Sequence, residues 1–120
     1  PPRQILPIIN HALTIYKLWH KYQNNFPKSL RYTLGEKIDK TFIQILEYLF
    51  VASYQSKNEK LPTIFLAIRK TDLLKFFLQI SWELGVLDNK KYIFISEKVN
   101  DLGRMLGGWK RGLESKTLQK

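Results

Sequence analysis

The stretch YIFISEKVNDLGRMLGGWKRGL, residues 92–113, carries apolar side chains that are spaced alternately three and four positions apart. Residues with this spacing lie on the same face of an α-helix, so the stretch predicts one continuous hydrophobic seam. A seam of this kind is typical of a helix that packs along its whole length against other helices. The seam residues are Tyr92, Ile95, Val99, Leu102, Leu106, Trp109 and Leu113.

Three earlier segments carry apolar residues with the same helical spacing. We predict helices at about 7–25, 34–55, 62–84 and 89–113. Pro27 ends the first helix, because the residue before a proline is disfavoured in the α conformation. Four such helices with short polar turns predict an all-α fold, namely an antiparallel up-down-up-down four-helix bundle that forms one domain over residues 1–120.

Local signals mark the ends of the last two helices. Pro62 is expected in the first turn of the third helix, where its missing N–H costs nothing. Gly85 suits the left-handed residue that closes this helix, and Asp88 suits the N-cap of the next one. A basic tail, residues 114–120, is expected to follow the fourth helix.

The third helix has more apolar surface than one seam requires. A helix that is apolar on several sides is either central or buried by another protein. We therefore predict that it takes part in oligomerisation, with a wide ordinary core as the alternative. Ile64, Phe65, Ile68, Phe76 and Trp82 lie off its expected core stripe. That stripe is Leu66, Leu73, Phe77, Ile80, Leu84 and Leu87.

The stretch RYTLGEK, residues 31–37, surrounds one glycine with cations, a Thr and a Glu. Thr33 and Glu36 have the spacing of a capping box, so we interpret the stretch as the start of the second helix. A phosphate-binding P-loop needs two glycines followed by Lys and Ser or Thr, and is therefore not supported. An additional hypothesis is that Lys28 and Arg31 contact a phosphate at this helix N-terminus.

Four glycines interrupt the fourth helix in GRMLGGWKRG, residues 103–112. Each glycine costs a helix interior up to about 1 kcal/mol relative to alanine, so this density needs a reason. Close packing against a neighbouring helix or subunit is favoured over a helix break or a ligand loop. Trp109 continues the seam and is assigned to the core or an interface, with nucleobase stacking as the alternative.

The charge distribution points to a polyanionic partner. The 120 residues carry 20 Lys and Arg against 10 Asp and Glu, a net charge of +10. Residues 1–31 hold five cations and no acid, residues 32–103 are nearly balanced, and residues 104–120 hold five cations and one acid. Basic ends favour nucleic acid through counterion release from phosphates, while a basic surface without a specific partner is the alternative.

Enzymatic and membrane functions find little support. There are no cysteines, so thiolate nucleophiles and Cys-ligated metals are excluded. His11 and His20 are predicted on opposite faces of the first helix, and Glu97 and Asp101 on a solvated face. No apolar run approaches the roughly 20 residues that span a bilayer. We expect a soluble cytoplasmic protein that is not an enzyme and needs neither cofactor nor metal.

Two of these stretches resemble one known family. FPKSLRYTLGEKI, residues 26–38, followed by DLGRMLGGWKR, residues 101–111, is similar to the accessory variability determinant (Avd) proteins of diversity-generating retroelements. Those proteins belong to a wider four-helix-bundle group that includes proteins encoded in ribosomal RNA intervening sequences. The matching residues are Phe26, Pro27, Arg31, Tyr32, Leu34, Gly35, Gly103, Arg104, Leu106, Gly107, Gly108 and Trp109.

The resemblance implies a small basic bundle without enzymatic activity that assembles into a ring-like homopentamer. It also implies association with a reverse transcriptase and with nucleic acid during mutagenic copying of a template repeat. We hypothesise that the chain is such an accessory subunit and binds RNA or DNA through its cations. The candidates are Lys17, Lys21, Lys28, Arg31, Arg69, Lys70, Lys75, Arg104, Lys110 and Arg111.

Two alternatives stay open. The first is a protein-docking module whose positive surface binds an acidic partner. The second is a free-standing RNA-associated bundle of the intervening-sequence type, which would act without a polymerase.

Overall fold

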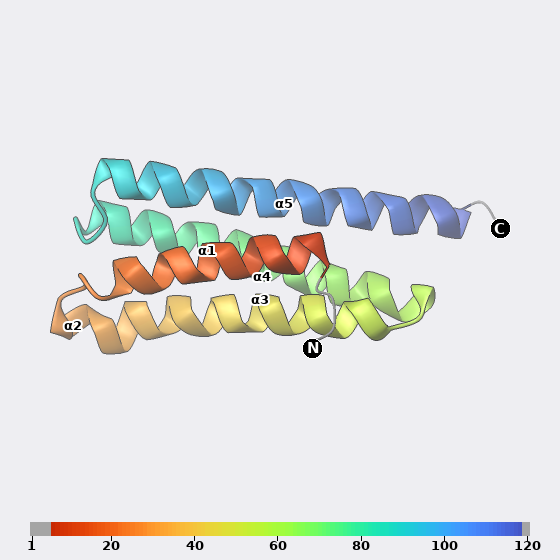
Figure 1. Cartoon of the computed structure of the whole chain (residues 1–120), viewed down its shortest axis with the longest axis horizontal. Helices are drawn as coiled ribbons and strands as arrows, with labels where there is room; N and C mark the ends of the chain where they lie inside the picture. The colour runs from red at the N-terminus through yellow and green to blue at the C-terminus, as the bar shows by residue number, and fades with distance from the viewer. Residues whose placement is uncertain (1–5, 119–120) are drawn as a thin grey trace.

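The fold is a bundle of four long helices, shown in Figure 1. The computed structural model describes the backbone of residues 6–118 and the side chains of residues 6–115, and these residues contain no strand. The all-α prediction is therefore confirmed. The elements are α1 (Pro7–Gln23), a short helical turn α2 (Lys28–Leu30), a π-helical turn η1 (Arg31–Gly35), α3 (Glu36–Tyr54), α4 (Lys57–Glu83) and α5 (Asn89–Leu118).

Each long helix packs against two others. The helix α1 contacts α3 and α5, and α4 contacts the same two helices from across the bundle. Consecutive long helices run in opposite directions, as predicted (Figure 1). Because α4 and α5 are longer than α1, they extend past its N-terminal end (Figure 1).

The predicted seams of α1, α3 and α5 form the core. Every seam residue of α5 is either buried or packed against the buried cluster. Trp19 of α1 stacks near Phe42 of α3 with 6.2 Å between ring centroids, and Phe26 meets Trp19 edge-on at 5.2 Å. Burying a large apolar side chain contributes roughly 1.5–3 kcal/mol, so these seams are the main source of stability.

The core side of α4 differs from the prediction. Of the expected stripe, Leu87 is buried and Phe77 packs against the core, but Leu66 and Leu84 are 42% and 58% exposed while Ile64, placed off the stripe, is fully buried. The large apolar residues Ile64, Leu74 and Leu78 face the core together with small and polar ones. The polar residues can do so because Thr71, for example, donates to the Ala67 carbonyl at 2.8 Å and needs no other partner. The buried residues of α4 are Thr63, Ile64, Ala67, Thr71, Leu74, Leu78 and Ser81.

The second helix does not begin with a capping box. Helical backbone starts directly after Pro27, whose carbonyl accepts a hydrogen bond from the Arg31 amide at 3.0 Å. The Thr33 hydroxyl donates back to the Leu30 carbonyl at 3.4 Å and does not cap Glu36. Proline cannot continue the helix before it but readily precedes a new one, so helical structure begins earlier than predicted.

Two other helix ends also differ from the prediction. The helix α4 starts at Lys57, so Pro62 lies inside the helix, where it removes one intrahelical hydrogen bond. The helix α5 continues through Leu118, so residues 114–118 are helical and do not form a departing tail. Residues 119–120 of the expected tail lie outside the described residues.

The turn between α4 and α5 has the predicted chemistry. Gly85 has a φ angle of 77°, and the Val86 amide donates to the Ser81 carbonyl at 2.9 Å, which closes α4 in a Schellman motif. Asp88 Oδ1 accepts from the Lys91 amide at 2.8 Å, as an N-cap does. This turn folds α5 back along α4 and brings their facing sides together.

Candidate functional site

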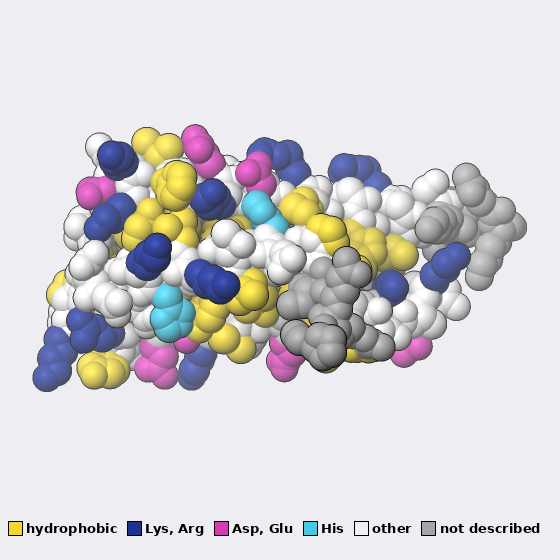
Figure 2. Space-filling model, in the orientation of Figure 1, with side chains coloured by type: hydrophobic (Ala, Val, Ile, Leu, Met, Phe, Trp, Pro, Cys, Tyr) yellow, Lys and Arg dark blue, Asp and Glu magenta, His cyan; other side chains and the backbone are white. Residues whose placement is uncertain are grey.

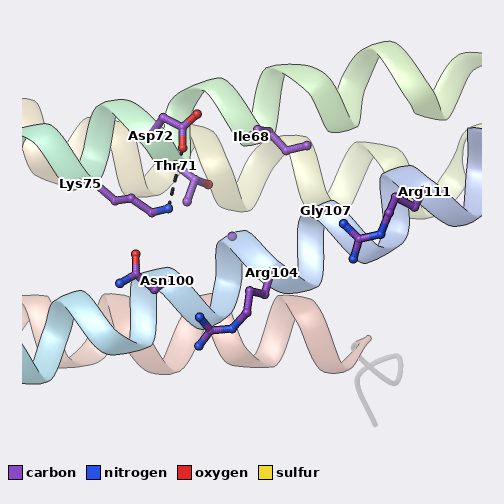
Figure 3. Close-up of a pocket in the computed structure, with 9 residues that line it drawn as sticks. Ile68, Thr71, Asp72, Lys75, Asn100, Arg104, Gly107 and Arg111 are labelled. Carbon is purple, nitrogen blue, oxygen red and sulfur yellow. Dashed lines mark ion pairs between the residues drawn. The ribbon is translucent and has the colours of Figure 1, made fainter.

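A groove between α4 and α5 brings several predicted binding residues together (Figure 3). Its volume is about 360 Å³. Three of the predicted cations, Lys75 from α4 and Arg104 and Arg111 from α5, border it. The complete lining is Ile68, Thr71, Asp72, Lys75, Asn100, Gly103, Arg104, Gly107 and Arg111.

Glycines leave room in this groove for cationic side chains. A Cβ atom at Gly103 would lie 3.2 Å from Lys75 Nζ, and one at Gly107 would lie 3.4 Å from an Arg111 guanidinium nitrogen. A Cβ atom at Gly112 would meet nothing within 4 Å. The predicted close approach of a neighbouring helix thus occurs at Gly103, through Lys75 of α4, but not at Gly107, Gly108 or Gly112 within one chain, and packing across subunits stays a prediction.

The three cations of the groove differ in how their charge is balanced. Lys75 Nζ lies 3.8 Å from Asp72 Oδ1, and Arg104 pairs with Asp101 of its own helix. Arg111 has no acidic partner within 4 Å among the side chains that the structure describes. Exposed pairs of this kind contribute only about 0–1 kcal/mol, so an anion can replace the carboxylates at little cost.

The predicted cations near the N-terminus lie outside the groove. Lys17 and Lys21 are exposed on α1, and Lys28 is exposed on α2. Arg31 has a structural role, because its guanidinium donates to the Phe26 carbonyl at 3.2 Å. Figure 2 shows Lys and Arg side chains spread over one face, with Asp, Glu and hydrophobic side chains between them. This face therefore carries no continuous basic patch.

The remaining predicted cations lie on α4 and α5. Arg69 is exposed and Lys70 is half-buried. Lys110 Nζ lies 3.7 Å from a Glu114 oxygen and 4.8 Å from the centre of the Phe65 ring. The structure thus gathers three of the ten predicted cations in one groove and leaves the others apart, and their binding roles stay predictions.

Four groove residues were not predicted from the sequence. They are Ile68, Thr71, Asp72 and Asn100. Their spacing of three, four and seven residues from Lys75 on α4 would have shown that the first three share a side with it. Asn100 carries no such signal, because only the packing of α5 against α4 brings it to the groove.

The family comparison covers almost the whole bundle. The model of the bAvd-like family matches residues 8–113, which include both sequence motifs and the groove. The chain belongs to the bAvd-like family. The Avd resemblance of the two motifs is therefore confirmed, and the family is one of accessory proteins. No curated protein matches the chain.

In this bAvd-like protein, the first motif builds the connection between α1 and α3. Phe26 is buried against Trp19, and a Cβ atom at Gly35 would lie 3.5 Å from the Phe26 ring. Tyr32, in contrast, is 67% exposed and takes no part in the core. Of the other motif residues, Leu34, Leu106 and Trp109 lie in or against the core, Gly103 and Gly107 line the groove, and Pro27 and Gly108 are exposed.

The described part of the bAvd-like protein holds no group of three His, Asp or Glu side chains that could bind a metal. His11 Nε2 lies 3.2 Å from the Lys98 carbonyl, and His20 Nε2 lies 3.2 Å from the Tyr16 hydroxyl. The two histidines thus lie in different surroundings, in agreement with the prediction that they lie on opposite faces of α1. None of the described helices combines the length and the apolar character that crossing a membrane demands.

Tyr16 links α1 to α3 on a different side of the bundle from the groove. Its hydroxyl donates to Asp39 Oδ1 at 2.9 Å. Burial raises the pKa of the Tyr16 hydroxyl to about 12, with further contributions from the hydrogen bond to Asp39 and from the charge of that carboxylate. The pair therefore holds two helices together through the neutral phenol.

Proposed function

We propose that this bAvd-like protein is a non-catalytic accessory subunit of a diversity-generating retroelement reverse transcriptase, and that it binds nucleic acid while the template repeat is copied. Membership of the family supports the accessory role. The groove between α4 and α5 supports the binding role, because Lys75, Arg104 and Arg111 border one hollow. Guanidinium groups bind phosphate oxygens with two parallel hydrogen bonds, and each phosphate contact releases counterions.

We propose further that the subunits form a cytoplasmic ring, a pentamer by analogy with the family. The outer face of α4, made of the exposed Leu66 and Leu84 and the half-buried Leu73, Phe77 and Ile80, supports an interface with a second copy. Leu66 and Leu84 are 42% and 58% exposed, and contiguous apolar surface of this kind marks interaction sites. A ring would repeat the groove around the assembly and so raise its avidity for a long polyanion.

A salt series tests nucleic-acid binding by the groove. Fluorescence anisotropy of labelled RNA and single-stranded DNA is compared for the wild type, for K75Q/R104Q/R111Q, and for a control of equal charge, K37Q/K40Q/K57Q. The slope of log affinity against log salt is expected to become shallower by roughly 2–3 in the groove variant alone. An equal loss in both variants would remove the groove from the proposal. Absence of wild-type binding at low salt would overturn nucleic-acid binding altogether.

The polymerase part is tested separately. The wild-type protein and its reverse transcriptase are purified together in the presence of nuclease. Retained association supports a direct accessory role, and complete loss means that nucleic acid bridges the two proteins.

A further inference from the structure

Two exposed phenylalanines stand at the two ends of the groove. Its α4 wall spans residues 68–75, and Phe65 precedes this wall while Phe76 follows it. The rings are 42% and 55% exposed. They are eleven positions apart, which is just over three helical turns, so they share one side of α4 about 16 Å apart. Asp72, which lines the groove, lies on this same side between them.

The Phe65 ring has a cation beside it. Lys110 Nζ lies 4.8 Å from the centre of the Phe65 ring, whereas the Phe76 ring packs against Phe77 with 6.2 Å between ring centroids. A cationic groove with an aromatic ring at either end has the composition of sites that bind single-stranded nucleic acid. In such sites the cations hold the backbone phosphates and the rings stack on bases.

We infer that the groove binds a single strand of RNA or DNA, with phosphates at Lys75, Arg104 and Arg111 and with bases stacked on Phe65 and Phe76. This inference rests on the proposed function and adds the class of nucleic acid and two stacking residues. Base stacking on these two rings distinguishes the inferred binding mode from electrostatic attraction alone, which does not involve them.

The shape of the groove favours a single strand over a duplex. Neighbouring helices pack with axes about 8–10 Å apart, and the hollow between these two has a volume of about 360 Å³. That space suits a phosphate and its sugar. A duplex presents its phosphates on a broad convex surface and keeps its bases stacked inside, so the two rings cannot reach a free base face.

Phe76 borders the proposed subunit interface, because its ring centroid lies 6.2 Å from that of Phe77. Around α4, Leu66 and Phe77 lie roughly 90° or more from the line that joins Phe65 to Phe76, and Leu73 lies about 70° from it. A substitution that keeps the apolar character of the rings should therefore leave assembly intact. Leucine meets this condition, because it is apolar but has no π face.

A substitution of Asp72 provides a second test of the same site. Its carboxylate lies 3.8 Å from Lys75 Nζ on the α4 side of the groove (Figure 3). Removing this charge frees Lys75 and removes a repulsion, so Asp72→Asn should strengthen binding. Glu36→Gln is the matched control, because Glu36 makes a similar pair with Lys40 at 3.6 Å, away from the groove.

The test uses the full chain and a fluorescein-labelled 20-nucleotide RNA, either single-stranded or annealed to its complement. At one salt concentration the single strand should bind at least about tenfold more tightly than the duplex. F65L/F76L should lose roughly tenfold in single-strand affinity for each ring. Its duplex affinity, salt slope and assembly mass should not change. Phe50→Leu, at a ring that is 55% exposed on α3, is the control and should bind as the wild type does.

The outcomes separate the two proposals. If neither RNA form binds and the single-stranded DNA of the salt series does not bind either, the proposed nucleic-acid binding fails. If duplex and single strand bind equally, or if F65L/F76L binds like the wild type, nucleic-acid binding stands and the single-strand inference is overturned. Should F65L/F76L lose its helicity, Asp72→Asn is measured with both RNA forms. A gain of about threefold or more over Glu36→Gln for the single strand alone supports the inference, and an equal gain for the duplex, or no gain, overturns it.

Discussion

The ammonium group of Lys75 occupies the space that a side chain at Gly103 would take, since a Cβ atom there would lie 3.2 Å from Nζ. A glycine inside a helix costs up to about 1 kcal/mol relative to alanine. Gly103 therefore lowers the stability of helix α5 at the position that Lys75 of α4 approaches. Gly112 lies on the same helix without a neighbour within 4 Å, and so it provides the natural comparison.

Alanine at these two positions should separate stability from binding. Both G103A and G112A should raise the free energy of unfolding by about 0.5–1 kcal/mol, because alanine favours the helix and the end of Lys75 can move aside. Only G103A should weaken RNA binding, because it displaces Lys75. Urea denaturation and anisotropy measure the two effects. Equal RNA affinity in both variants would show that the position of Lys75 does not matter.

Alanine at Gly85 should have the opposite effect on stability. The φ angle of 77° at Gly85 is a left-handed conformation, which costs other residues about 1–2 kcal/mol. G85A should therefore lower the free energy of unfolding by about 1 kcal/mol without changing helical content at low temperature. Circular dichroism during urea denaturation checks this, and a stabilised G85A would contradict the observed turn.

Ionisation of Tyr16 should weaken the bundle at high pH. The pKa of its hydroxyl is raised to about 12 from the model-compound value of 10.0, so the folded state favours the neutral form. This contribution is complete below pH 10 and is lost as the pH rises through 12. Tyr16→Phe should be less stable than the wild type by about 1 kcal/mol at pH 8, a difference that shrinks towards pH 12.

Urea denaturation of the wild type and of Tyr16→Phe across this pH range measures the difference between their free energies of unfolding. The other tyrosines and lysines titrate in both proteins, so their contributions cancel in this difference. A difference that stays constant up to pH 12 would mean that the neutral phenol is not preferred in the folded state.

The outer face of α4 should control assembly. L66Q/L84Q replaces two exposed leucines, so it should lower the assembly mass while helicity stays the same. Gln79→Ala, at an exposed position on another side of α4, is the control and should assemble like the wild type. Sedimentation measures the masses. An unchanged mass in L66Q/L84Q would place the interface elsewhere, and a monomeric wild type would overturn the ring.

Most of the bundle could be predicted because α1, α3 and α5 each carry a single apolar stripe. When a helix has one such stripe, its period shows which face is buried, and Ile15, Ile45 and Ile95 are accordingly inaccessible. The turn at Gly85 and Asp88 was also predictable, since its chemistry acts within a few residues. The start of helical structure directly after Pro27 was not predicted, because the sequence contains two competing helix-start signals. The proline precedes the capping-box pattern in the chain, and helical structure begins at the proline.

The sequence by itself therefore determined the class of the fold, the number of long helices and the buried faces of three of them. Only the tertiary structure decided the orientation of α4, because a helix with two apolar stripes can turn either one inward. Here Ile64 is buried and Leu66 is exposed. The groove depends on the same decision. The sequence spacing of Lys75 and Arg104 does not predict that they line the same groove. They do so because core packing sets how α4 is rotated against α5.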